Sequence, residues 1–282
     1  MTKTQQYYKD FGFCEGSFSN TSAVNELVHI CSDYLTTKFK QEVPLSSYHL
    51  YCQSDEEHRE LHFQLTKLLR KSQLHHKIMA ENQEHFQQLV GSDIDIQVEP
   101  YLRISRPQIY EDNIGMHRDT FYGNTAYEIS CVVPLVDFEP GCGVNVLPKS
   151  HLLGPLEFES VAHPIIEKGS KQNSIGFLYS TKKIKNLDMS NLYAPMLKRG
   201  DYFMFSLCSI HGQEVNSSNI TRWSIDFRFK NSFAPINVNL KSDYYKSFSA
   251  SPANAIAQQY YQVNCNEIAE MKGAFPLTES KI

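Results

Sequence analysis

The sequence has no regular cysteine pattern. Its seven cysteines are scattered and odd in number, and no two of them form a CxxC pair. This scatter argues for reduced thiols. We therefore expect a cytoplasmic protein.

The sequence also lacks long apolar runs and a large charge excess. No window resembles a transmembrane span, and residues 1–6 lack the apolar stretch of a signal peptide. The net charge is −4, and the basic clusters are short and are typical of solvent-exposed loops. We therefore expect no nucleic-acid or membrane partner. Nothing in the sequence specifies an oligomeric state.

What the sequence does contain is enough apolar material for a sizeable core. With 282 residues, of which 41% are hydrophobic, we expect one domain over residues 1–282. We divide it into a helical N-terminal part (1–92), a β-rich core (93–232) and a C-terminal extension (233–282).

The helical prediction rests on caps and apolar spacing. Residues 20–22 can cap a helix that runs to about residue 39. A second helix should begin near residues 54–57, and a third should cover 76–90. The tail from 251 to about 263 is expected to form a last helix outside the core.

After Gly91 the pattern becomes β-like. Residues 94–105 alternate, and 126–136 form a nearly continuous apolar run. Further short runs, separated by turn signals, cover 144–147, 174–178, 194–197, 201–207 and 222–229. Helices followed by many short strands predict a mainly β fold with flanking α: a double-stranded β-helix, or jelly-roll (cupin-like) barrel, backed by the N-terminal helices.

The most informative motif is His117-Arg118-Asp119, with His211 and Arg222 further along the chain. In an extended strand His117 and Asp119 point to the same side. Together with a distant imidazole they form a facial triad that leaves metal positions open, which suits non-haem Fe(II). Arg222 supplies a permanently charged fork for a carboxylate.

Residues 222–229 alternate strictly. The odd positions are large and apolar, whereas the even positions, from Arg222 and Ser224 to Arg228, are polar. An amphipathic strand with its polar side in water would show the same pattern. The proximity of His211 in the sequence instead favours a polar face that lines a site inside a barrel.

Three segments, which together span roughly residues 95–230, resemble the phytanoyl-CoA dioxygenase-like family of 2-oxoglutarate oxygenases. They are the H-x-D segment 115–120, the glycine-opened segment 141–151, and His211-Gly212 followed by Arg222-Trp223-Ser224. Lys149 stands where the family usually has glycine. That difference affects a turn and leaves the chemistry untouched.

The resemblance implies that His117, Asp119 and His211 are catalytic iron ligands, and that Arg222 and Ser224 bind the distal carboxylate of 2-oxoglutarate. Tyr101, Arg103 and Thr125 are plausible further contacts. The implied enzyme uses Fe(II), 2-oxoglutarate and dioxygen to hydroxylate, or otherwise oxidise, a C–H bond of a small polar metabolite, such as a sugar, an aminocyclitol or an amino-acid derivative.

The alternative is a non-oxygenase cupin-like protein, either a metal isomerase or a ligand-binding module. A cupin isomerase has no reason to keep a buried guanidinium such as Arg222 opposite its metal. His58 and His62 lie four residues apart and could pair on a metal ion. With no third ligand evident, we expect them on a solvated helix face. We expect His75, His76 and His85 at the surface as well.

Overall fold

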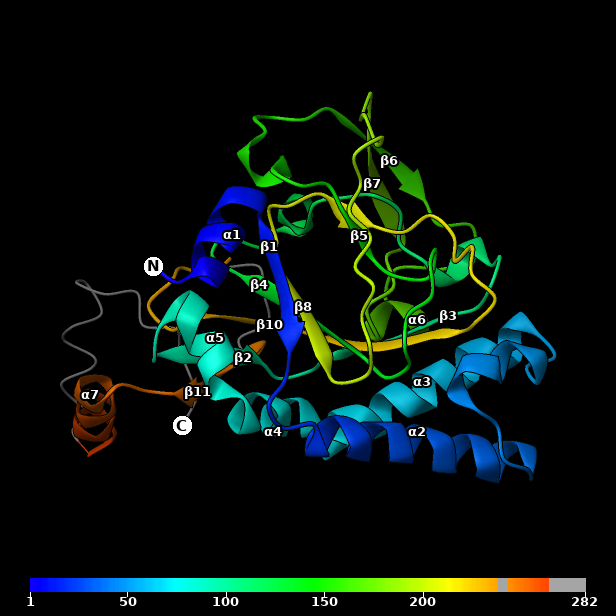
Figure 1. The fold of residues 1–282 in the computed structure, drawn as a ribbon, viewed down its shortest axis with the longest axis horizontal. Helices are drawn as coiled ribbons and strands as arrows, with labels where there is room; N and C mark the ends of the chain where they lie inside the picture. Colours follow the sequence, from blue (N-terminus) through cyan, green and yellow to red (C-terminus); the bar gives the residue numbers. More distant parts are fainter. Residues whose placement is uncertain (238–242, 264–282) are drawn as a thin grey trace.

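The computed structural model describes residues 1–237 and 243–263. Residues 238–242 and 264–282 of the predicted C-terminal extension, Cys265 among them, lie outside the described residues. It shows a mixed α/β protein built on a mainly antiparallel sheet (Figure 1). Among the described residues, no helix combines the length and the apolar character needed to cross a membrane.

Helices dominate the N-terminal part, as predicted. They are α1 (Lys3–Phe11), α2 (Ser22–Phe39), α3 (Asp55–Ser72), α4 (Leu74–Glu81) and α5 (Gln83–Val90), with a 3-10 turn η1 (Leu45–Leu50). The predictions for α2 and α3 are confirmed, and the Ser54 hydroxyl caps α3 by accepting a hydrogen bond from the Glu57 amide. Sequence analysis missed α1.

The single helix predicted over 76–90 is wrong. Two helices, α4 and α5, meet at Asn82, whose backbone leaves the helical region. The Asn82 side chain instead binds the backbone of Asn20, accepting from its amide at 2.9 Å and donating to its carbonyl at 2.8 Å. These hydrogen bonds hold the chain at the junction of α4 and α5 against the residues just before α2.

The major sheet has the order β1-β8-β4-β10-β2-β11, and β3 also pairs with β10. Its strands are β1 (Phe13–Ser17), β2 (Ile94–Gln97), β3 (Tyr101–Ser105), β4 (Ile129–Pro134), β8 (Asp201–Ser206), β10 (Arg222–Asn231) and β11 (Tyr245–Ser249). All its pairings are antiparallel. Sequence analysis missed β1, which joins the helical N-terminal part to the sheet.

The long strand β10 separates the core from the cavity side. Trp223, Ile225, Phe227 and Phe229 are fully buried in the main apolar cluster, which also contains residues of the N-terminal helices. Figure 1 shows α2, α3 and α4 along this side of the sheet. The predicted alternation is therefore confirmed, and the polar face of β10 points the other way.

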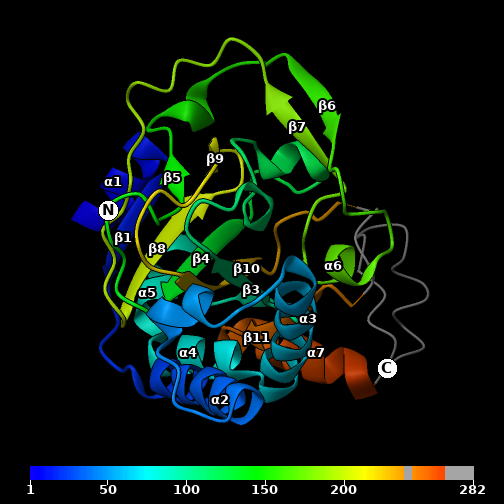
Figure 2. The ribbon, with the colours of Figure 1, turned by 90° about the vertical axis from the view of Figure 1, so that its right-hand side faces the viewer.

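Opposite that polar face lie shorter elements. Strand β5 (Asn145–Val146) pairs with β9 (His211–Gly212), and the hairpin of β6 (Phe158–Ala162) and β7 (Ser180–Ile184) extends beyond them (Figure 2). Short helical turns complete this side: η2 (Tyr110–Asp112), η3 (Asp119–Tyr122), η4 (Ser150–Leu152) and α6 (Lys171–Ser174). The C-terminal helix α7 (Pro252–Val263) agrees with the prediction.

Two predicted strands are wrong. Residues 174–178 leave α6 through a turn in which Gly176 has φ +98°, and Ile175 and Phe177 pack into a small separate cluster. Residues 194–197 run as an irregular connection. In both places some apolar side chains, such as Phe177 and Leu197, are buried without a partner strand, and periodicity alone cannot distinguish such a run from a strand.

Candidate metal centre

The structure brings His117, Asp119 and His211 together. One potential ligand atom of each lies within 4.8 Å of the others, and all three side chains are buried. Nε2 of His117 is 3.5 Å from Oδ1 of Asp119, and Nε2 of His211 is 3.9 Å from its Oδ2. In the part of the chain that the structure describes, no other group of three or more His, Cys, Asp or Glu side chains is placed to hold an ion.

The local backbone is extended through Arg118, as predicted. His117 forms a single bridge to His211, Arg118 has φ −114° and ψ 135°, and the chain enters η3 only at Asp119. Arg118 does point away, since its guanidinium donates to the carbonyls of Ser150 and Leu153. The extended backbone at Arg118 therefore places His117 and Asp119 on the same side, by the alternation that the sequence predicted.

Both imidazoles are oriented by backbone carbonyls. Nδ1 of His117 lies 2.7 Å from the Gly115 carbonyl oxygen, and Nδ1 of His211 lies 3.0 Å from that of Ser209. A carbonyl can only accept, so each Nδ1 carries the proton. Each Nε2 then presents a lone pair toward Asp119, which is the form that binds a metal ion.

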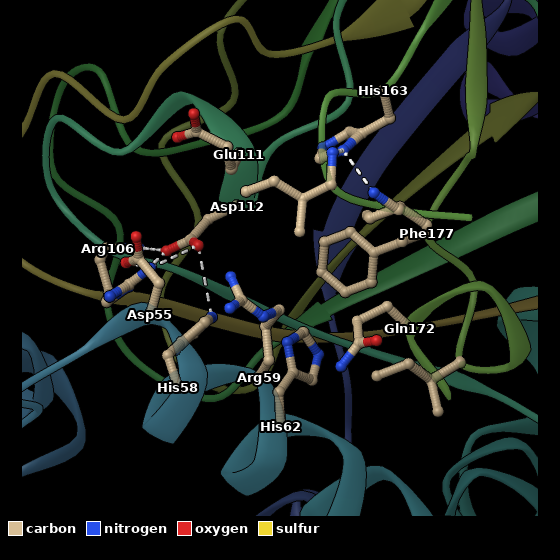
Figure 3. Close-up of a pocket in the computed structure, with 13 residues that line it drawn as sticks. Asp55, His58, Arg59, His62, Arg106, Glu111, Asp112, His163, Gln172 and Phe177 are labelled. Atoms are coloured by element: carbon tan, nitrogen blue, oxygen red, sulfur yellow. Dashed lines mark hydrogen bonds and ion pairs between the residues drawn. The ribbon is translucent and has the colours of Figure 1, made fainter. Parts of the chain in front are cut away.

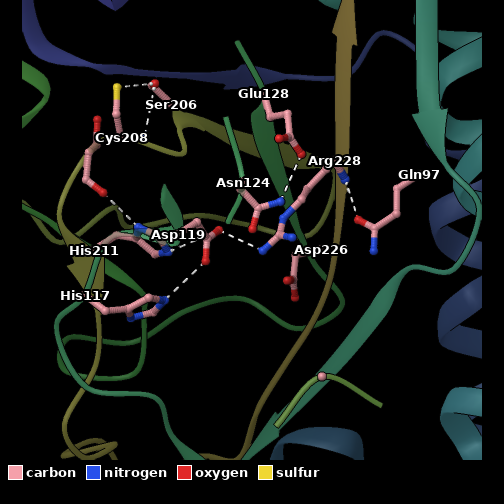
Figure 4. A network of polar contacts seen from close by, with 12 residues as sticks. Gln97, His117, Asp119, Asn124, Glu128, Ser206, Cys208, His211, Asp226 and Arg228 are labelled. Carbon is pink, nitrogen blue, oxygen red and sulfur yellow. Dashed lines mark hydrogen bonds and ion pairs between the residues drawn. The ribbon is translucent and has the colours of Figure 1, made fainter. Parts of the chain in front are cut away.

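Asp119 is held as a carboxylate. Burial opposes its ionisation, but the Arg228 guanidinium at 2.8 Å favours the carboxylate and helps to keep the pKa of Asp119 well below its usual range (Figure 4). Burial and the neighbouring His117 lower the pKa of His211 to about 4. At neutral pH Asp119 is therefore a carboxylate and His211 a neutral imidazole, which are the forms that bind a metal ion.

Arg222 and Ser224 lie on the same face of β10, and both are buried. Nη1 of Arg222 donates to Oε1 of Gln213 at 2.9 Å, whereas its buried Nε has no hydrogen-bond partner. Burial lowers the pKa of Arg222 to about 10, so the group stays charged at neutral pH. Among the described residues no carboxylate forms an ion pair with it.

These five residues line one cavity of about 300 Å³. Other polar residues around it are Tyr101, Arg103, Asp112, Tyr122, Asn124, Asn173, Gln213, Asp226, Arg228 and Tyr244. Tyr101 and Arg103 thus lie where the sequence predicted contacts. Thr125 is absent from the lining, and its hydroxyl donates to the Pro235 carbonyl.

Sequence analysis placed Asp226 and Arg228 on the correct face but gave them no role. In the structure Asp226 accepts from Nε of Arg103 at 3.1 Å, and Arg228 binds Asp119. The sequence signal that could have suggested a role for them was their alternation with the apolar residues Trp223 and Ile225, which places them on the polar face of the strand. Tyr244, Asn124 and Gln213 carried no recognisable pattern.

The prediction of a solvated face for His58 and His62 is wrong. Both are buried, beside a smaller cavity that shares Asp112 with the larger one (Figure 3). Nε2 of His58 lies 3.4 Å from Oδ1 of Asp112, and Nε2 of His62 lies 2.8 Å from the Leu102 carbonyl oxygen. They serve the packing of α3 and do not join a metal-ligand group among the described residues.

The other histidines that we expected at the surface also differ. His75 is fully buried, with Nε2 2.9 Å from the Gln97 carbonyl oxygen, and His76 and His85 are half-buried. The sequence places all three among polar neighbours, which concealed their contacts with the sheet.

The chain was compared with known proteins. No protein-family model and no curated protein sequence matches it. Among solved structures it is similar to the non-heme monooxygenase ThoJ in its apo form, with a TM-score of 0.58, 14% identity, and coverage of 88% of this chain and 84% of that chain. It is also similar to the epimerase SnoN in complex with Fe3+, alpha ketoglutarate and nogalamycin RO, with a TM-score of 0.50, 12% identity, and coverage of 87% and 97%. At these identities the likeness shows that the chain shares their fold.

Proposed function

We propose that this protein is a non-haem Fe(II)- and 2-oxoglutarate-dependent dioxygenase that oxidises an unactivated C–H bond of a small polar metabolite. One observation carries the proposal. Two imidazoles and a carboxylate converge in the same cavity as Arg222, a buried guanidinium with no carboxylate partner among the described residues. The structural likeness to ThoJ and to the SnoN complex supports it.

In this proposal His117, Asp119 and His211 hold the iron. Two neutral nitrogens and one carboxylate suit Fe(II) and leave coordination positions open for co-substrate and dioxygen. Bound iron with 2-oxoglutarate supplies the oxidising power of the reaction. The surrounding residues keep the ligands oriented and shield the centre from bulk water.

Arg222 and Ser224 bind the far carboxylate of 2-oxoglutarate. A carboxylate beside Arg222 would replace the hydration that burial removes and would partner the free Nε. Ser224, two residues along the same strand face, can donate its hydroxyl to the same group. The remaining polar lining, including Arg103, Asn124 and Asp226, suits a substrate rich in hydroxyl or amino groups.

The fold supports the same reading. We propose that the major sheet and the short β5–β9 pair are the two faces of a double-stranded β-helix, and that residues 1–282 form one oxygenase domain of the phytanoyl-CoA dioxygenase-like type. The six described cysteines are all free thiols, which suits the cytoplasm. Hydroxylation is the favoured outcome, but the structurally similar SnoN is an epimerase, so the product must be determined directly.

The discriminating experiment is anaerobic addition of Fe(II) and then 2-oxoglutarate, followed by visible absorption. We expect the weak metal-to-ligand charge-transfer band of the chelated keto acid, and its loss in His211→Ala. A folded wild-type protein without the band would favour a cupin-like isomerase or a ligand-binding module.

A further inference from the structure

Arg228 contacts a candidate metal ligand from a position that the proposed function leaves without a role. It lies on the polar face of β10, and its side chain is 15% exposed. Nη2 donates to Oδ2 of Asp119 at 2.8 Å, and Nη1 donates to the Tyr244 hydroxyl at 2.7 Å. Its backbone amide donates to Oε1 of Gln97 at 2.9 Å. The guanidinium is therefore held at both terminal nitrogens, and Figure 4 shows its contact with Asp119.

These contacts make the two oxygens of Asp119 unequal. Oδ2 already accepts a charge-assisted hydrogen bond, which is among the stronger kinds. Oδ1 faces Nε2 of His117 at 3.5 Å, and the oxygen held by Arg228, Oδ2, lies 3.9 Å from Nε2 of His211. Of the two oxygens, Oδ1 is the one left for an ion that both imidazoles also bind.

We propose that Arg228 is a positioning residue that restricts Asp119 to one-oxygen binding of the metal ion. A carboxylate that binds through both oxygens occupies two coordination positions, and Arg228 keeps one of them open by retaining Oδ2. This inference rests on the proposed function, because it requires an ion at His117, Asp119 and His211.

A purely electrostatic role for Arg228 predicts the opposite result. A buried cation close to the centre repels a divalent ion, so its removal would tighten metal binding. A positioning role predicts weaker binding, because groups that orient metal ligands typically contribute a factor of about 10–100 to affinity. The direction of the change therefore separates the two roles.

The test uses Co(II) as the probe in the full-length protein, without 2-oxoglutarate or dioxygen. Arg228→Met keeps much of the side-chain volume but removes the charge and all five donors. We expect Co(II) binding to weaken about 10–100-fold, with a change in the visible d–d bands that report coordination number. Equal or tighter binding, or an unaltered spectrum, would overturn the proposal.

Arg103→Met is the matched control. Arg103 is a guanidinium on the neighbouring strand β3 that lines the same cavity, but it pairs with Asp226 and not with a candidate ligand. We expect Co(II) affinity and spectrum to match those of the wild type. A loss as large as that of Arg228→Met would show that removing either cavity guanidinium disturbs the site, whether or not it contacts Asp119, and would also overturn the proposal.

Tyr244→Phe provides a second variant that keeps Arg228 and removes only its anchor at Nη1. We expect a smaller loss of Co(II) affinity in the same direction, with circular dichroism as the check on folding. If Arg228→Met does not fold, an unchanged affinity and spectrum in Tyr244→Phe would overturn the proposal. A wild-type protein that binds no Co(II) would instead contradict the proposed function itself.

Discussion

The backbones of His117 and His211, 94 positions apart in the sequence, bind each other twice. The His117 amide donates to the His211 carbonyl at 2.9 Å, and the His211 amide donates to the His117 carbonyl at 3.0 Å. Their ring centroids lie 4.5 Å apart. The spacing of the two imidazoles is therefore set by a direct backbone pair as well as by side-chain packing.

Gly212 is essential to this pairing, and Gly212→Ala should disrupt it. Its φ is +146°, and a Cβ would come within 2.5 Å of the Gly115 carbonyl oxygen, a backbone atom that cannot move freely. We expect a loss of about 1–3 kcal/mol of stability and weaker Co(II) binding, measured by urea unfolding and by metal titration. Gly154→Ala is the control, since a Cβ there meets nothing within 4 Å. Wild-type metal affinity in Gly212→Ala would show that the bridge does not set the site.

Arg222→Ala should raise the 2-oxoglutarate concentration needed for succinate formation. Loss of a buried, charge-assisted carboxylate contact costs about 2 kcal/mol or more, which is at least roughly 30-fold in affinity. The concentration dependence of succinate release measures it. Arg199→Ala, at an exposed position, should behave as the wild type. Unchanged succinate formation in Arg222→Ala would make the assignment of Arg222 wrong.

Asp112→Ala should destabilise the protein strongly. Asp112 accepts from Nε of Arg106 at 2.8 Å and from its Nη2 at 2.9 Å, and both side chains are buried. Its removal leaves a buried guanidinium poorly compensated, at a cost of about 3 kcal/mol. The second partner of Arg106 is Asp55, whose side chain is 59% exposed. Asp55→Ala should therefore cost less than about 1 kcal/mol. Similar urea midpoints for the two variants would contradict this ranking.

Stability should fall as the pH drops below 6.5, because His75 is buried in its neutral form. Burial and the neighbouring His76 lower the pKa of His75 to about 3 in the folded protein. Between this pKa and the unfolded value near 6.5, only the unfolded chain takes up the proton, so acid favours unfolding. Stability is fully present above pH 6.5 and is lost toward pH 3, by about 1.4 kcal/mol per pH unit for this group.

Urea unfolding at pH 7, 6 and 5 measures this dependence. His62 and His76 have lowered pKa values as well, so the total slope contains several contributions. His75→Gln removes one of them, and the slope should fall by about 1.4 kcal/mol per pH unit. An unchanged slope in His75→Gln would show that His75 does not titrate in this way.

The local patterns of the sequence were sufficient for several elements. The cap at Ser54 and the apolar spacing of 24–35 predicted α3 and α2, and the alternation of 222–229 predicted both faces of β10. These signals are local. A helix or strand with one buried face has apolar residues at a regular spacing, which can be recognised within a few turns of a helix or a few residues of a strand. The same local reading missed β1 and the exposed strand β6, which form only by pairing with distant segments.

By itself the sequence determined which residue types are available: two histidines and an aspartate in the right order, and a guanidinium on the polar side of an alternating strand. Only the tertiary structure decided that His117 and His211 share a backbone bridge and that Arg228 holds one oxygen of Asp119. It also decided that His58 and His62 are buried. The physical reason is that hydrogen bonds and burial depend on which residues lie opposite a side chain in space. A local sequence pattern identifies one partner of each contact but not the distant residue that it meets.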